Sequence, residues 1–137
     1  MEKDNQLPIR SEKGSTSFAL ATFERSDLPA ALATPSLLSL AREHGRERAE
    51  EAVFVALTNA DSLLGGGMGA PQLVAMTKLF MEDYGGRPVG SILMAIRNGV
   101  RQATVGHKLT YPILCEWMRA QDAAVEEHNY TQHLSNR

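Results

Sequence analysis

The run Gly65-Gly66-Gly67-Met68-Gly69 is the segment of this sequence that most invites comparison with a phosphate-binding loop. Such a loop follows a strand, opens a helix and ends in Gly-Lys-Ser/Thr, whose lysine contacts the phosphate. Here the run follows a helical pattern, and the next lysine is Lys78. We therefore interpret the run as a connection between two helices and predict no nucleotide binding.

The histidines and the single cysteine are the residues that could hold a metal or form a catalytic pair. His128 and His133 are five residues apart, so they do not share a helix face as an i, i+4 metal pair does. His44 falls near a predicted helix C-terminus, where it suits the helix dipole. His107 is the base nearest to Cys115 in sequence, but nothing orients the two, and the apolar surroundings of Cys115 favour a buried structural thiol. The pattern predicts no metal site, no catalytic residue and no cofactor.

Neighbouring carboxylates occur as Glu50-Glu51, Glu82-Asp83 and Glu126-Glu127. Adjacent residues on a helix point in different directions, so these pairs indicate solvated helix surface and not an acid–base pair. Because no nucleophile, ligand set or acid–base pair is found, a non-enzymatic protein is the prediction.

One charge pattern does indicate contact with a partner. All 16 Asp and Glu residues lie outside the segment from Tyr84 to Cys115. That segment carries basic side chains at Arg87, Arg97, Arg101, His107 and Lys108. A patch of one sign attracts anionic partners, so we predict that this segment contacts nucleic acid or an acidic protein surface. The alternative is that acids are missing here by chance.

Bulk properties limit the classes of protein that remain. A chain of 137 residues is the usual size of one domain. The net charge of −2 and the pI of about 6.1 exclude a globally basic nucleic-acid binder. One cysteine allows no intrachain disulfide, and the sequence has no apolar stretch typical of a signal peptide or a membrane helix. We expect a protein of the bacterial cytoplasm that does not enter a membrane.

The elements that position these residues are predicted to be helices. Residues 1–17 are polar and are predicted to be a disordered arm, ahead of a single helical domain at 18–137. Thr34-Pro35 suits a helix start, and Gly45 suits the end of that helix. Apolar residues at steps of three and four predict a helix over 46–64, which the glycine run ends.

The second half of the chain predicts further helices. One runs from Pro71 to Tyr84, and a shorter one follows Pro88 and is interrupted at Asn98-Gly99. Residues 101–110 are predicted to be a loop, weakly strand-like over 102–105, and a last helix begins near Thr110. The prediction is an all-α bundle of four or five helices with glycine-rich turns. Its expected core is Val53, Leu57, Leu64, Leu73, Phe80, Ile92, Ile96, Ile113 and Trp117.

Short sequence elements follow one another in order over about two-thirds of the chain. They are Leu40 through Gly45, Asn59 to Leu64 with the glycine turn, Met68, Gln72, Tyr84, Arg97-Asn98-Gly99, Gly106, Ile113, Trp117 and Met118. With them, the stretch from Leu38 to Glu127 resembles a group of small helical accessory proteins of bacteriophages and mobile elements. The size and layout are also similar to those of small helical helicase loaders, an analogy of fold alone.

This resemblance implies a phage or mobile-element accessory protein. With the helicase-loader analogy and the basic segment, the predicted function is a non-enzymatic protein that binds a protein partner, in DNA replication, with weak DNA contact through residues 87–108. One alternative is a phage-encoded inhibitor of a host defence system or host enzyme. Another is a small virion or assembly protein.

Overall fold

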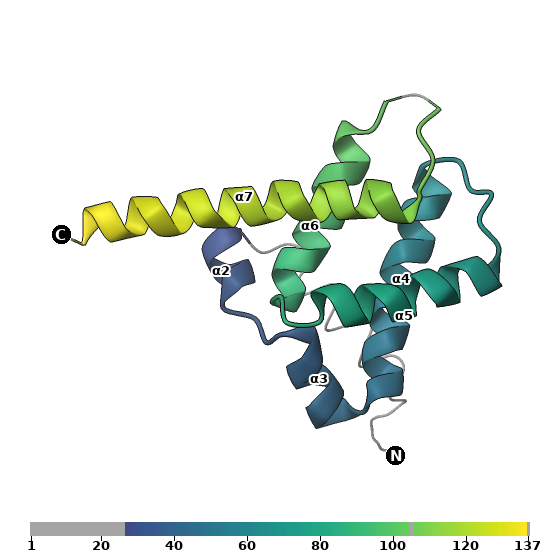
Figure 1. Cartoon of the computed structure of the whole chain (residues 1–137), viewed down its shortest axis with the longest axis horizontal. Helices are drawn as coiled ribbons and strands as arrows, with labels where there is room; N and C mark the ends of the chain where they lie inside the picture. Colours follow the sequence, from purple (N-terminus) through teal and green to yellow (C-terminus); the bar gives the residue numbers. More distant parts are fainter. Residues whose placement is uncertain (1–26, 105, 137) are drawn as a thin grey trace, which may run out of the picture.

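The computed structural model describes residues 27–104 and 106–136, and these residues form six α-helices and no strand. The helices are α2 (Leu28–Leu32), α3 (Leu37–His44), α4 (Arg46–Leu63), α5 (Ala70–Tyr84), α6 (Val89–Gln102) and α7 (Tyr111–Ser135) (Figure 1). The all-α class is thus confirmed. The described helices exceed the four or five predicted because α2, a short helix capped by Asp27, precedes the first predicted one. The predicted arm at residues 1–17 lies outside the described residues.

Helix α6 is the element around which the fold is built, since it packs against α2, α4 and α7. Helix α4 in turn packs against α3 and α5. The largest fully buried side chains come from five different helices, which shows that one core joins them. They are Phe80, Leu37, Leu57, Ile92, Leu114, Met118 and Val89.

Helix α3 begins later than predicted. Its N-cap is Ser36, whose hydroxyl accepts a hydrogen bond of 3.1 Å from the N–H of Ser39. Thr34, the predicted cap, instead joins α2 to α6. Its hydroxyl donates to the carbonyl of Ala31 at 2.6 Å and accepts from the N–H of Gly90 at 2.9 Å. The side chain that looked like a cap is therefore used in a tertiary contact.

Helix α6 continues through Asn98-Gly99 to Gln102, so the predicted interruption there is wrong. Gly99 is buried because the indole of Trp117 lies against it. A Cβ atom at position 99 would lie 2.1 Å from Cδ2 of Trp117. This glycine serves close packing between α6 and α7. Gln102 is the last residue of α6, so the weak strand prediction is wrong at this residue.

Six of the nine predicted core residues are buried, and the other three are only partly buried. The exceptions are Leu64, Ile113 and Trp117, of which Leu64 and Trp117 pack against the buried core. Leu114 and Met118 take the buried positions on α7. The buried stripe of α7 therefore lies one residue further along the chain than the predicted core residues, while Trp117 packs against Gly99 of α6.

Helix α7 is 25 residues long, about 37 Å at the usual helical rise. Its buried residues, Leu114, Met118 and Gln121, all lie in its first half. Figure 1 shows the second half extending beyond the rest of the described chain. No helix among residues 27–104 and 106–136 has the length and hydropathy that crossing a bilayer requires.

Candidate functional site

Arg87, the first basic residue of the acid-free segment, is held in an ion pair with Asp122 of α7. Nη2 lies 2.7 Å from Oδ2 and Nε lies 3.3 Å from Oδ1, a two-pronged contact. The guanidinium also lies over the ring of Tyr84, 5.2 Å from its centroid. The hydrogen bond to Asp122 raises the pKa of Arg87. The positive charge of Arg87 is thus already paired with a carboxylate of this chain.

The other four predicted contact residues lie toward the opposite end of α6. Arg97 is half-buried, whereas Arg101, His107 and Lys108 are exposed in the last turn of α6 and the connection that follows. From residue 87 to residue 101 the helical rise amounts to about 20 Å. The fold therefore brings Arg101, His107 and Lys108 to one end of α6 and leaves Arg87 at the other.

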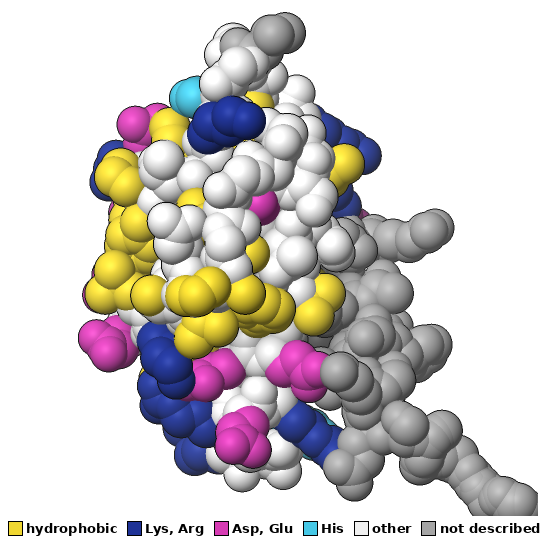
Figure 2. All heavy atoms as spheres, turned by 90° about the vertical axis from the view of Figure 1, so that its right-hand side faces the viewer, with side chains coloured by type: hydrophobic (Ala, Val, Ile, Leu, Met, Phe, Trp, Pro, Cys, Tyr) yellow, Lys and Arg dark blue, Asp and Glu magenta, His cyan; other side chains and the backbone are white. Residues whose placement is uncertain are grey.

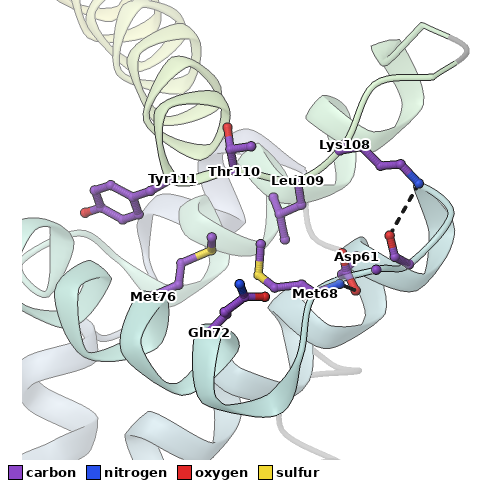
Figure 3. Close-up of a pocket in the computed structure, with 10 residues that line it drawn as sticks. Asp61, Met68, Gln72, Met76, Lys108, Leu109, Thr110 and Tyr111 are labelled. Atoms are coloured by element: carbon purple, nitrogen blue, oxygen red, sulfur yellow. Dashed lines mark hydrogen bonds between the residues drawn. The ribbon is translucent and has the colours of Figure 1, made fainter.

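Lys108 lines a cleft that the sequence did not predict. Its ammonium lies 3.5 Å from the carbonyl oxygen of Gly66, so the α6–α7 connection reaches the turn between α4 and α5. A cleft of about 480 Å³ lies between these segments (Figure 3). This volume is in the range of natural small-ligand pockets. Its residues are Asp61, Gly66, Gly67, Met68, Gln72, Met76, Lys108, Leu109, Thr110 and Tyr111.

The glycine run shapes one wall of the cleft. Gly65, Gly66 and Gly67 have φ angles of 106°, 74° and 111°, a region that other residues adopt only with strain. The N–H of Gly66 donates to the carbonyl of Asp61 at 2.7 Å, which turns the chain sharply after α4. The turn brings the N–H of Met68 back toward the Asp61 carboxylate.

Asp61 is the buried charge of the cleft, with only 7% of its surface exposed. The one hydrogen bond that its side chain makes within the described residues comes from the N–H of Met68, at a long 3.4 Å. Sequence reasoning missed this residue. The available signal was an acid on the apolar stripe of its helix, one residue after Ala60 and four after Leu57, both of which are buried.

Tyr111 lines the cleft, and Tyr84 packs against the core. The hydroxyl of Tyr111 donates to Asp83 at 2.6 Å, and burial followed by this hydrogen bond raises the pKa of Tyr111. The thiol of Cys115 and then burial raise the pKa of Tyr84 to about 12. Cys115 is half-buried, so the expected buried thiol is confirmed only in part. Its described polar neighbour is Tyr84 and not His107.

The described residues contain no group of three or more His, Cys, Asp or Glu side chains placed to hold a metal ion. The acidic pair Glu50-Glu51 is also less solvated than predicted. The side chain of Glu50 is 19% exposed and lies 3.0 Å from Arg46 and 3.6 Å from Lys78. The contact with Lys78 ties α4 to α5, whereas the contact with Arg46 lies within α4.

Exposed hydrophobic side chains form two further surfaces. Figure 2 shows hydrophobic side chains gathered on the face where α5 begins. A groove of about 320 Å³ between α4 and α5 contains Phe54 and Val74 beside the ion pair of Glu50 and Lys78. On the projecting half of α7, Tyr130 is 64% exposed and Leu134 is 43% exposed.

Comparison of the chain with protein-family models, with curated proteins and with solved structures finds no match. Function is therefore inferred from the residues described above.

Proposed function

We propose that this chain is a non-enzymatic accessory protein that inserts the projecting half of α7 into a groove on a protein partner. The observation that carries the proposal is that α7 continues to Ser135, although its last buried residue is Gln121. A helical segment of this length is marginal in water without tertiary contacts. A partner surface would supply the contacts that the described part of this chain does not.

Two anchor side chains lie on this segment. Tyr130 and Leu134 are four residues apart, so they share one face of the helix, and both are exposed. Helical ligands commonly bind grooves through apolar residues at this spacing, and tyrosine is enriched among the residues that contribute most to binding.

Charge identifies the kind of groove. Between Ala120 and Asn136 the chain carries Asp122, Glu126 and Glu127 but no Lys or Arg. Asp122 is matched by Arg87, which leaves two acids on the projecting segment. A partner groove with an apolar floor and a Lys- or Arg-rich rim complements this segment. Pairing with a second copy would instead bring like charges together.

The basic segment gives less support to nucleic acid as the partner. Arg87 is ion-paired and Arg97 is half-buried, so three of the five predicted contact residues remain exposed. We therefore propose a protein as the main partner. A role in phage DNA replication remains a prediction.

The test is affinity purification from the expressing cell, followed by measurement of the dissociation constant for each protein identified. The variant Tyr130→Ala/Leu134→Ala should bind the specific partner about tenfold or more weakly, as expected when two anchor side chains are truncated. Leu63→Ala is the matched control, because Leu63 is an exposed leucine at the end of α4. Equal binding by the double variant and the wild type would contradict the proposal.

Sedimentation of the purified protein tests the second-copy alternative. The proposal expects a monomer at micromolar concentration. A dimer that the double variant abolishes would show that α7 binds another copy of this chain and would overturn the proposal of a separate partner.

A further inference from the structure

We infer that the cleft between the glycine turn and the α6–α7 connection binds a free α-amino acid with an apolar side chain. This cleft is lined by α4, the glycine turn, α5, the α6–α7 connection and Tyr111, the first residue of α7. The inference therefore does not depend on the partner proposed for the far end of α7.

Two opposite charges face the same turn without neutralising each other. The Asp61 carboxylate accepts from Met68 at 3.4 Å, and the Lys108 ammonium lies 3.5 Å from the Gly66 carbonyl. Both contacts are long, and the described residues place no ion pair on either side chain. A buried carboxylate normally has shorter and stronger donors. Each charge therefore has capacity for a ligand group.

The arrangement of the charges matches the head group of an α-amino acid. Figure 3 shows Asp61 and Lys108 at one end of the cleft. An α-amino acid carries its ammonium and its carboxylate on one carbon atom, so the ammonium would meet Asp61 and the carboxylate would meet Lys108. Both contacts are charge-assisted hydrogen bonds, of which the one to Asp61 is shielded from water.

The remainder of the cleft accepts an apolar side chain. The side chains of Met68, Met76 and Leu109 converge beyond the charged end (Figure 3). Methionine side chains are flexible and polarizable, so they adapt to aliphatic and aromatic groups of different shape. The expected ligands are therefore leucine, methionine or phenylalanine, and not aspartate or lysine.

Ligands with a single charge fit this cleft less well. Lys108 would repel a simple amine, and the buried Asp61 would repel a fatty acid or a phosphate. Only a zwitterion satisfies both side chains at once.

The test is calorimetric titration of the full-length protein with L-leucine and with two analogues that each lack one charge. Isoamylamine lacks the carboxylate, and isocaproate lacks the ammonium. We expect both analogues to bind about tenfold or more weakly than leucine, because each leaves one charged partner unmatched. Equal binding of either analogue, or no binding of leucine, methionine and phenylalanine, would overturn the inference.

Variants of the two charged residues provide the second arm. Asp61→Asn keeps the acceptor for Met68 but removes the charge, and Lys108→Met removes the ammonium from an exposed position. Each variant should bind L-leucine about tenfold or more weakly than the wild type, since a charged contact is lost. Glu82→Gln and Arg101→Gln are the matched controls at exposed sites outside the cleft, and both should bind as the wild type does. If Asp61→Asn fails to fold, Lys108→Met decides the outcome alone, and wild-type affinity in that variant would refute the site.

Discussion

At the scale of single residues, the contact between Gly99 and Trp117 holds α6 against α7. Gly99→Ala would place a Cβ atom 2.1 Å from the indole, so the helices must separate or the ring must rotate. Overpacking of this kind costs about 1–3 kcal/mol, and the better helix propensity of alanine returns about 0.5–1 kcal/mol. We expect a net loss of stability, measured as a lower urea midpoint.

A matched substitution separates packing from backbone effects. Gly86→Ala lies where nothing approaches within 4 Å, so it should leave the midpoint nearly unchanged. Combining Gly99→Ala with Trp117→Leu should reduce the effect of the alanine, because the smaller side chain leaves room for the added methyl group. If the alanine costs the same in both backgrounds, the indole does not lie against Gly99.

The free energy of unfolding should depend on pH in the alkaline range because of two tyrosines. The Cys115 thiol and burial raise the pKa of Tyr84 to about 12, and burial and Asp83 raise the pKa of Tyr111. An unfolded phenol loses its proton near pH ~10, so above that pH the folded state binds more protons than the unfolded state. The stabilisation is therefore complete below pH ~10 and is lost as the pH rises toward the folded pKa.

The prediction is a falling free energy of unfolding between pH ~10 and pH ~12. Tyr84→Phe should make this fall smaller, as measured by urea denaturation at a series of pH values. Tyr130→Phe, at an exposed position on α7, is the control and should behave as the wild type. A Tyr84→Phe protein with an unchanged pH profile would argue against the contact with Cys115.

At the scale of elements, the pair of Arg87 and Asp122 fastens the start of α6 to the middle of α7. Both side chains are about 40% exposed, at 40% and 38%, so solvent screens much of their attraction. A double-mutant cycle with Arg87→Gln and Asp122→Asn should give a coupling of about 0.5–1 kcal/mol that decreases with added salt. A coupling near zero at low salt would show that the two-pronged contact does not persist in solution.

Helix boundaries marked by local chemistry could be predicted from the sequence. Helix α4 was expected over 46–64 and spans Arg46–Leu63, because a glycine run ends it regardless of tertiary packing. The start of α7 was expected near Thr110, whose hydroxyl accepts from the N–H of Ile113 at 3.3 Å. Both signals lie within a few residues of the boundary that they set.

Features that depend on distant residues could not be predicted in this way. Two neighbouring stripes on α7 are both apolar, and the surface of α6 decides that Leu114 and Met118 are buried and Trp117 is at the edge. Likewise, Gly99 lies within α6, and its local sequence does not show that the indole of Trp117 packs against it. The cleft at Asp61 is completed by Lys108, Leu109, Thr110 and Tyr111, which come from a segment distant in the chain.

At the scale of the whole molecule, the candidate surfaces lie far apart. The cleft is beside the beginning of α7, and the exposed Tyr130 and Leu134 are at its far end, about 30 Å away by the helical rise. Ligand binding in the cleft and partner binding by α7 can therefore take place together.

The distribution of basic residues leads to a prediction for nucleic acid. The net charge is −2, and the exposed basic residues of the acid-free segment are Arg101, His107 and Lys108. Each phosphate contact adds about −0.9 to the slope of log K against log salt, so these residues support a slope no steeper than about −3. Anisotropy titrations of a labelled DNA duplex over a range of salt concentrations measure this slope.

The double variant Arg101→Glu/Lys108→Glu should make the salt slope about two units shallower. The variant Arg87→Gln should leave the slope unchanged, because Arg87 is bound to Asp122. A wild-type slope well beyond −3, or a clear loss of binding in Arg87→Gln, would show that the ion pair opens and that the whole segment from Arg87 to Lys108 contacts DNA.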